Sequence, residues 1–185
     1  MKITISGTLG SGKSTVAKLV ANKLSLKNYQ SGGFMREMAT ERGMTLNEFQ
    51  ILAEKDKSID HEIDERQKKL GQTENNFILE ARLGYHFIPD SFKIYLKTNT
   101  EVAAERIQKS MEKTNSERER EGLTNDKQEI IKSLERRRES EKKRYKDFYN
   151  IDYEDETNYD LVIDTSNINA EQVSEIIVEK IKRKS

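Results

Sequence analysis

The sequence contains no cysteine, so it can form neither a disulfide framework nor a cysteine-based metal site. It has no surplus of either charge, because 33 lysines and arginines balance 33 aspartates and glutamates. A general nucleic-acid-binding protein normally has a basic surplus, so this balance argues against that class. No stretch resembles a signal peptide or the apolar run of about 18 residues that indicates a membrane helix. We therefore expect a cytoplasmic protein that binds neither membranes nor nucleic acid.

Apolar residues are scarce as well, at 34% against 36% charged residues, and the shortage is uneven. Residues 1–100 and 161–185 have ordinary apolar periodicity, whereas residues 112–156 are dominated by charge. A chain of 185 residues without internal repeats or a low-complexity linker is typical of one domain. We expect a compact core with one charged excursion rather than a disordered chain.

The strongest motif is Gly-Thr-Leu-Gly-Ser-Gly-Lys-Ser at residues 7–14, which fits the phosphate-binding pattern G-x-x-x-x-G-K-[ST]. Residues 2–5 alternate like a strand, and apolar residues recur at helical spacing after Lys13, so the loop joins a strand to a helix. Glycines let backbone N–H groups turn toward an anion, and the start of the helix attracts phosphate. The motif predicts that Lys13 reaches the outer phosphates of ATP and that Ser14 binds the accompanying Mg²⁺. The predicted ATP-binding residues are Gly7, Thr8, Leu9, Gly10, Ser11, Gly12, Lys13, Ser14 and Thr15.

Strands alternate with helices along most of the chain. Besides residues 2–5, strands are expected at residues 28–30, 77–79, 93–97 and 161–163. This alternation predicts an α/β fold of three layers (α/β/α) with a five-stranded parallel sheet and right-handed crossovers. Ligands of such sheets bind beyond the carboxyl ends of the strands. We therefore expect the chemistry at residues 7–14, 30–36, 80–84 and 164–166.

Two stretches depart from the alternation. Three helices in succession are expected at residues 34–42, 45–56 and 58–70, which indicates an insertion between two strands. Ser58 is expected to cap the third of them and Gly71 to follow its end. A capping-box pattern at residues 45–48 marks the start of the second of these helices, and another at residues 98–101 predicts one further helix start. Residues 110–123 are polar and aperiodic, which is typical of a loop, and a charged helix follows to about residue 149.

Two arginines follow strands at the expected ligand edge. Arg36 opens the helix after Ser31-Gly32-Gly33, and Arg82 follows Glu80. A guanidinium fork suits phosphate oxygens, although a single arginine is more often simply solvated. Glu80 has two interpretations: it orders a Mg²⁺-bound water or the acceptor ribose, or it pairs structurally with Arg82.

The charged helix offers a second group of candidates. Arg137 and Arg144 lie two turns apart on one face, with Glu141 between them. They are positioned to hold a phosphate and the acceptor base or sugar. The alternative is a solvated charged face with pairs between neighbouring turns. Arg118 and Arg120 lie in the polar loop and are candidates for contact with the transferring phosphate, or members of an ordinary charged segment.

In this order and spacing the motifs resemble those of the short, archaeal-type cytidylate kinases, which belong to the P-loop nucleoside monophosphate kinases. The resemblance covers nearly the whole chain and includes residues 59–67, 89–96, 138–145 and 164–166. The family glycine after the acidic residue is replaced by Ala81. The resemblance implies a monomer that transfers a phosphoryl group from ATP to CMP, and also to dCMP, with Mg²⁺ bound together with ATP.

The resemblance also assigns parts and residues. It implies a core (1–31, 72–109 and 150–185), an insertion that binds the nucleoside monophosphate (about 32–71), and a lid with the charged helix (about 110–149). It implies catalytic roles for Lys13, Arg137, Arg118 and Arg120. It implies acceptor binding by Ser31, Gly32, Arg36, Asp60, Asp64, Gln67, Glu80, Arg82, Arg137, Glu141 and Arg144. The metal is expected at Ser14 and, through water, at Glu80.

Other functions share some of these features. A P-loop kinase for UMP, AMP, shikimate or dephospho-coenzyme A has the same fold and the same donor site, and differs only in its acceptor pocket. A non-catalytic nucleotide-dependent switch, or an RNA-associated P-loop protein that uses the basic helix, is the alternative from another class. The balanced charge disfavours RNA binding, and a switch has no use for a pair of acceptor-phosphate arginines.

Overall fold

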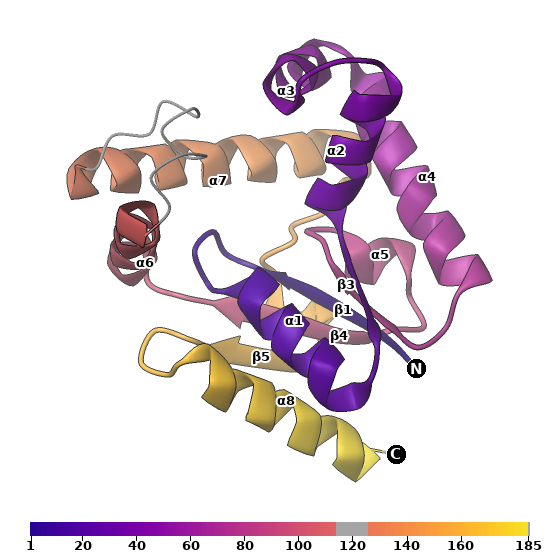
Figure 1. Cartoon of the computed structure of the whole chain (residues 1–185), viewed down its shortest axis with the longest axis vertical. Coiled ribbons are helices and arrows are strands. Elements are labelled where there is room, and N and C mark those ends of the chain that lie inside the picture. Colours follow the sequence, from indigo (N-terminus) through magenta and orange to yellow (C-terminus); the bar gives the residue numbers. More distant parts are fainter. Residues whose placement is uncertain (114–125, 185) are drawn as a thin grey trace.

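Five parallel strands form the centre of the computed structural model, which describes residues 1–113 and 126–184 (Figure 1). The strands are β1 (Lys2–Gly7), β2 (Lys27–Gln30), β3 (Phe77–Glu80), β4 (Phe92–Lys97) and β5 (Leu161–Asp164). Their order in the sheet is β2-β3-β1-β4-β5, which confirms the predicted parallel sheet and all five predicted strands. The register sets Ile5 opposite Glu80 and Gly7 opposite Leu96, so the P-loop and Glu80 leave the same edge of the sheet.

Helices cover both faces of the sheet. On one face, α1 (Lys13–Leu24) and α8 (Ala170–Lys184) lie side by side and bury one core cluster with residues such as Ile5, Val20 and Ile177 (Figure 1). On the other face, α5 (Gly84–Phe87) packs on β1, and Leu79 and Ile88 belong to a second cluster. Strands buried on both faces are apolar in consecutive positions, which explains the continuous run in β3. Among the residues described, no helix combines the length and the apolarity needed to cross a membrane.

The insertion consists of α2 (Ser31–Glu41), α3 (Leu46–Lys55) and α4 (Lys57–Thr73). It has an apolar cluster of its own, in which Met38, Phe49 and Ile59 are fully buried. The insertion extends away from the sheet at the edge where the strands end (Figure 1). Beside this separate core, Phe34 of α2 and Leu70 of α4 pack with Phe77 and Leu79 of β3, which joins the insertion to the sheet.

The charged part of the chain forms α6 (Thr100–Lys113) and α7 (Lys127–Tyr149). Ala104, Met111 and Ile130 pack between these helices and supply the few apolar contacts available there. The first residues of the predicted loop are therefore helical, because α6 continues through residue 113. The rest of that loop lies outside the described residues, and so do Arg118 and Arg120.

The structure corrects several predicted helix ends. Helix α2 begins at Ser31, directly after β2, rather than at residue 34. The glycines after Ser31 occupy its first turn, where N–H groups have no partner inside the helix, so their low helix propensity has little effect. Gly71 lies inside α4 rather than after it; glycine suits this position because a Cβ there would come within 2.9 Å of an Ile88 side-chain carbon. The cap of α4 is Asp56, whose carboxylate accepts from the Ser58 N–H, not Ser58 itself.

The two capping-box predictions have different outcomes. Thr45 and Glu48 form the complete reciprocal pair at the start of α3, as predicted. At α6 the cap is instead Asn99, whose Oδ1 accepts from the Glu101 N–H at 2.7 Å. A longer-range contact decides this, because the Thr98 N–H donates to Thr8 Oγ1 and so binds the start of α6 to the P-loop.

Candidate active site

The P-loop wraps around the amino end of α1. At Gly7 a Cβ would lie 2.0 Å from the Leu96 carbonyl oxygen, so only glycine fits where the loop leaves β1 beside β4. Gly12 has φ 83° and is the N-cap of α1, with no side-chain cap on the helix. The first N–H groups of α1 are therefore left to the loop, which is the arrangement that binds a phosphate.

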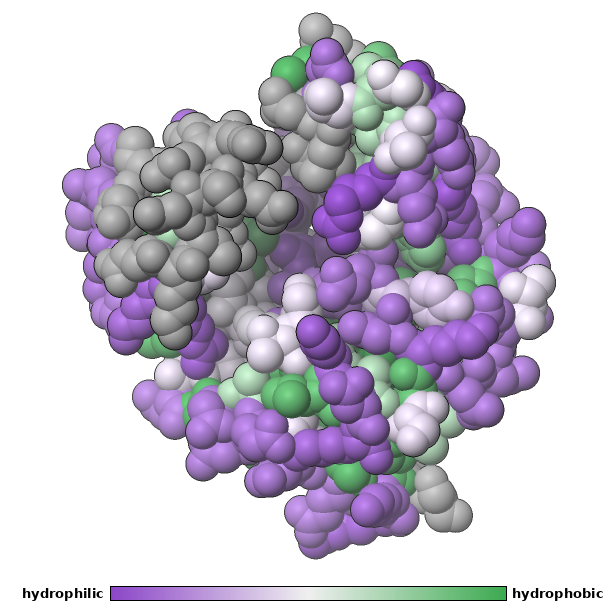
Figure 2. All heavy atoms as spheres, viewed as in Figure 1, coloured by the Kyte–Doolittle hydropathy of each residue, from purple (hydrophilic) through white to green (hydrophobic). Residues whose placement is uncertain are grey.

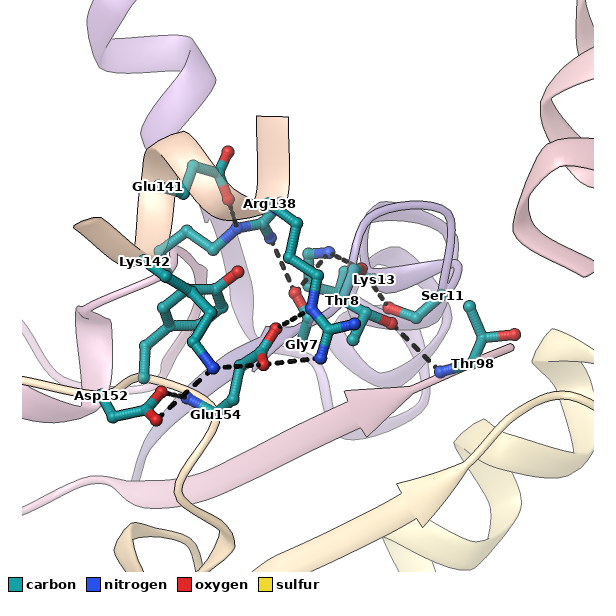
Figure 3. Close-up of polar contacts among 12 residues, drawn as sticks. Gly7, Thr8, Ser11, Lys13, Thr98, Arg138, Glu141, Lys142, Asp152 and Glu154 are labelled. Atoms are coloured by element: carbon teal, nitrogen blue, oxygen red, sulfur yellow. Dashed lines mark hydrogen bonds and ion pairs between the residues drawn. The ribbon is translucent and has the colours of Figure 1, made fainter. Parts of the chain in front are cut away.

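Long-range hydrogen bonds fix the loop from the ends of two neighbouring strands. The Thr8 N–H donates to the Leu96 carbonyl at 2.9 Å, and Thr98 N–H donates to the Thr8 hydroxyl at 3.1 Å (Figure 3). From the end of β5, the Thr165 hydroxyl donates to the Ser11 carbonyl at 3.1 Å. The phosphate cradle is therefore held in place by residues from β4 and β5 as well as by its own glycines.

Lys13 is buried, and its ammonium lies inside the loop. Nζ donates to the carbonyl oxygens of Thr8 at 2.6 Å and Gly7 at 3.1 Å (Figure 3). Burial, reinforced by the positive charge of Arg82, lowers the pKa of Lys13 well below its ordinary value. A phosphate that enters the loop would place negative charge next to the buried Lys13 ammonium and so stabilise its charged form.

Ser14 and Glu80 meet at the mouth of the cradle. The Ser14 hydroxyl donates to Glu80 Oε2 at 2.8 Å, so β3 brings its terminal carboxylate to the start of α1. Mg²⁺ prefers oxygen ligands and is commonly held by one or two protein oxygens together with substrate phosphates. Within residues 1–113 and 126–184, no group of three or more acidic, histidine or cysteine side chains is placed so that it could hold a metal ion. Ser14 and Glu80 therefore fit a magnesium ion that is bound with a nucleotide rather than by the protein alone.

Arg82 and Arg137 are held together by one buried carboxylate. Glu141 accepts from Arg82 Nε at 2.8 Å and from Arg137 Nε at 3.1 Å, and Arg82 also donates to the Gly7 carbonyl at 2.9 Å. Burial alone would raise the pKa of Glu141, but the charges of the two arginines outweigh burial and keep it below its ordinary value. Of the two interpretations of Glu80, the pairing with Arg82 is wrong: Arg82 pairs with Glu141, which reaches toward the P-loop from α7 (Figure 3).

One cavity of about 920 Å³ joins these groups. Its lining includes the P-loop, Glu80, Arg82, Arg137 and the loop after β5 at residues 165–170. Arg106 also lines it and donates to the Thr165 carbonyl at 2.5 Å, a contact that holds the loop after β5. No sequence motif indicates a role for Arg106, and only the tertiary structure brings it to this loop.

The cavity lining includes three of the predicted acceptor residues, Glu80, Arg82 and Arg137, whereas the others lie on the insertion and on α7 outside it. Ser31 and Gly32 open α2, and Arg36 is exposed on it, without a carboxylate partner among the described residues. On α4, Asp60 lies 3.5 Å from the Arg144 guanidinium. Arg137 and Arg144 therefore have different partners, although they share α7 as predicted. In the space-filling view the surface is hollowed beside the insertion, and hydrophilic residues are seen on the insertion's side of the hollow (Figure 2).

Asp64 and Gln67 form a buried polar pair on α4, with exposed fractions of 7% and 3%. Gln67 Nε2 donates to Asp64 Oδ1 at 3.4 Å, and the other carboxylate oxygen accepts from the Tyr149 hydroxyl. The sequence analysis missed Tyr149, because an aromatic residue at the end of a helix carries no motif. Burial raises the pKa of Asp64 to about 6, and the Tyr149 hydrogen bond opposes this rise.

The run of three arginines on α7 separates in the structure. Arg136 is exposed, and Arg137 Nε donates to Glu141. Arg138 Nε donates instead to Glu154, at 2.6 Å (Figure 3). Lys142 also donates to Glu154, at 3.1 Å. The contacts with Glu154 anchor α7 to the segment before β5, so the helix keeps Glu141 directed at the P-loop.

Comparison with known proteins gives consistent matches. The sequence model described as the Cytidylate kinase-like family matches residues 2–167. The cytidylate kinase of Archaeoglobus fulgidus is 41% identical over 186 residues, which cover 100% of this chain and 96% of that protein. The cytidylate kinase of Methanocaldococcus jannaschii is 43% identical over 183 residues, which cover 96% of this chain and 95% of that protein. The structure of shikimate kinase from Acinetobacter baumannii has a TM-score of 0.63 at 16% identity, and the matched region covers 100% of this chain and 94% of the kinase chain. The two proteins therefore have the same fold.

Proposed function

This chain belongs to the cytidylate kinase-like family, and we propose that it transfers the γ-phosphoryl group of ATP to CMP, and also to dCMP, giving ADP and the diphosphate. The observation that supports this most directly is the single cavity in which the P-loop meets Arg82 and Arg137. A P-loop alone indicates only nucleotide binding. Arg82 and Arg137, held beside the P-loop by Glu141, add positive charge where the phosphate of CMP would approach the γ-phosphate of ATP.

On the donor side, residues 7–15 bind ATP. The backbone of the loop and the start of α1 hold the phosphates, and Lys13 turns its ammonium from the Gly7 and Thr8 carbonyls toward the β- and γ-phosphates. Ser14 and Glu80 hold Mg²⁺, which neutralises phosphate charge when it is bound. Arg106 and the loop after β5 border the same cavity and enclose the nucleoside end of ATP.

On the acceptor side, Arg36, Arg82 and Arg137 bind the phosphate of CMP. Ser31 and Gly32 at the start of α2, Glu80 at the ribose, and Glu141 and Arg144 on α7 complete the pocket. Asp60, Asp64 and Gln67 face the base. Gln67 Oε1 is buried without a partner among the described residues, and Asp64 is an acceptor when ionised. Two acceptors suit the exocyclic amine of cytosine, which is a donor, better than the carbonyl that uracil has at that position.

The transfer itself needs positioning and charge neutralisation rather than a base. The acceptor oxygen belongs to an anionic phosphate, so it attacks the γ-phosphorus while the bond to the β-phosphate oxygen breaks. Lys13 and Arg137 neutralise the charge that develops, and Arg118 and Arg120, outside the described residues, are the proposed contributions of the lid. Arg82 keeps the acceptor phosphate in line with the P-loop, because Glu141 and the Gly7 carbonyl fix its guanidinium.

A panel of acceptors tests the function. ADP formation from ATP and Mg²⁺ is measured with CMP, dCMP, UMP, AMP, GMP and shikimate, and we expect the highest kcat/KM with CMP. Turnover with shikimate but with none of the nucleotides would overturn the proposal. Tight ATP binding without turnover of any acceptor would favour a nucleotide-dependent switch. The predicted monomer and cytoplasmic location are checked separately, by light scattering of the purified chain and by cell fractionation.

A further inference from the structure

Three helices meet at Tyr149, which is the last residue of α7. Its ring packs edge-on against Phe87 of α5 at 5.8 Å and against Phe148 at 6.2 Å. Its hydroxyl donates to Asp64 Oδ2 on α4, so the contact links the insertion to α7. Because the ring is held on two sides, the direction of the hydroxyl is fixed by packing rather than by the hydrogen bond alone.

The carboxylate that receives this bond lies in a polar pair that is not fully satisfied. Asp64 Oδ1 accepts from Gln67 Nε2 at 3.4 Å, and Gln67 Oε1 has no partner among the residues described, although Gln67 is 3% exposed. Buried acceptors without partners are uncommon in folded proteins, and binding sites are one of the places where they occur. The pair is therefore built to receive a donor that the protein itself does not supply.

We propose that Tyr149 is a positioning residue of the acceptor pocket: its hydroxyl fixes the Asp64 carboxylate so that Asp64 and Gln67 together accept the amine of a cytosine base. This inference rests on the proposed function for the identity of the base. Tyr149 does not touch the base and acts through Asp64. A purely structural link between α4 and α7 is the alternative, and the neighbouring contact of Asp60 with Arg144 at 3.5 Å shows that these helices have a second link.

The charges around Asp64 show how the Tyr149 hydroxyl affects the ionisation of this carboxyl group. Burial of Asp64 and the nearby Asp60 favour the protonated carboxyl, whereas the Tyr149 hydroxyl, Lys68 and His61 favour the ionised carboxylate. The titratable and charged groups at this junction are Asp60, His61 and Lys68 on α4, Arg144 and Tyr149 on α7, and His86 on α5. An ionised Asp64 is an acceptor only, so loss of the hydroxyl weakens recognition of a donor amine more than it weakens recognition of a carbonyl.

Tyr149→Phe tests the inference at pH 7.5. We expect the KM for CMP to rise roughly tenfold, as for loss of one hydrogen bond to a charged group. The KM for UMP should rise less, and kcat and the KM for ATP should change little. In the substrate-free protein, the pKa of Asp64, followed by the ¹³C chemical shift of its carboxyl carbon, should increase. A merely structural link would raise the KM for CMP and UMP alike.

The matched control is Tyr159→Phe, which removes a hydroxyl that donates to the Tyr153 carbonyl at 2.6 Å in the aromatic cluster beside the sheet. It should lower the melting temperature without changing the preference for CMP over UMP. A double-mutant cycle with Asp64→Asn gives a second, independent readout of the coupling. The two substitutions together should raise the KM for CMP no more than Asp64→Asn alone, since both act through one carboxylate.

Failure of the proposed function and failure of the role proposed for Tyr149 give different experimental results. A wild-type chain that does not phosphorylate CMP overturns the proposed function, and with it the assignment of a cytosine base to this pair. A wild type that phosphorylates CMP, combined with a Tyr149→Phe variant whose KM for CMP and Asp64 pKa are both unchanged, overturns the role of Tyr149 alone. Fully additive effects in the double-mutant cycle lead to the same conclusion.

Discussion

The two halves of the proposed site are built in different ways. The donor half is one run of nine residues, Gly7 to Thr15, whose shape depends on glycines and on the start of one helix. The acceptor half draws on α2, α4, the end of β3 and α7, and ion pairs across long sequence separations hold it together. Arg82 and Glu141 are 59 positions apart, for example, and they share a hydrogen bond of 2.8 Å.

This difference shows where sequence substitutions act. In the donor half, a side chain that contacts phosphate can be removed without disturbing the backbone that shapes the loop. In the acceptor half, removal of an ion-paired group such as Glu141 leaves its partner charges without compensation, so binding and stability change together. Four predictions test this contrast, beginning with the largest expected effect.

Lys13→Ala should lower kcat roughly 10²–10³-fold, because it removes a fixed positive charge from the transferring phosphate. The melting temperature should change little, since glycines and the bonds from Thr98 and Thr165 maintain the loop. Steady-state ADP formation and thermal unfolding measure both quantities. Lys18→Ala, at an exposed position of the same helix, is the matched control and should retain wild-type kcat. A Lys13→Ala variant that retains more than a tenth of wild-type kcat would show that Lys13 does not stabilise the transferring phosphate.

Glu141→Gln should reduce both activity and stability. It leaves Arg82 buried without its counter-charge, which costs about 3 kcal/mol of unfolding free energy. It also releases Arg137, so kcat should fall in the same variant. Urea unfolding gives the first effect and ADP formation the second. Glu139→Gln, exposed on the same helix, should change neither, and equal unfolding free energies for the two variants would contradict the contrast between the halves.

Arg36→Ala should raise the KM for CMP roughly ten- to a hundredfold, as for loss of hydrogen bonds to a charged phosphate. The KM for ATP should stay close to wild type, because Arg36 lies on the insertion and not beside the P-loop. Initial rates at varied CMP and varied ATP separate the two constants. Arg183→Ala, on α8, is the charge-matched control. An equal rise in the KM for CMP and the KM for ATP would show that Arg36 does not act on the acceptor alone and would assign it to the donor half.

Besides its effect on the KM for CMP, Asp64→Asn should change stability, and this change should be the smallest of the four effects. Burial raises the pKa of Asp64 from 3.8 to about 6, so the folded state binds its proton more tightly than the unfolded chain does. Ionised Asp64 therefore weakens the fold above about pH 6, and this penalty disappears as the pH falls toward about 4. The variant should melt above the wild type at pH 7.5, with a smaller difference at pH 5. The same difference at both pH values would show that Asp64 does not titrate in this range.

Local patterns were sufficient for much of the fold. The five strands followed from apolar periodicity, and the capping box of Thr45 and Glu48 needed only four neighbouring residues. Errors occurred where a distant contact outweighed a local preference. Gly71 is predicted to follow the end of a helix, yet it lies inside α4, where close packing against Ile88 leaves no room for a Cβ. Asn99 rather than Thr98 caps α6, because the Thr98 backbone is bound to Thr8.

The sequence by itself determined the strand–loop–helix at residues 7–14, because neighbouring glycines, a lysine and a serine suffice to specify a phosphate cradle. Tertiary structure alone decided which groups face each other across the cleft. It paired Glu141 with both Arg82 and Arg137, and it brought Tyr149 to Asp64. The physical reason is range: backbone geometry is fixed within a few residues, whereas the pairing of buried charges depends on how α4, α7 and the sheet pack together.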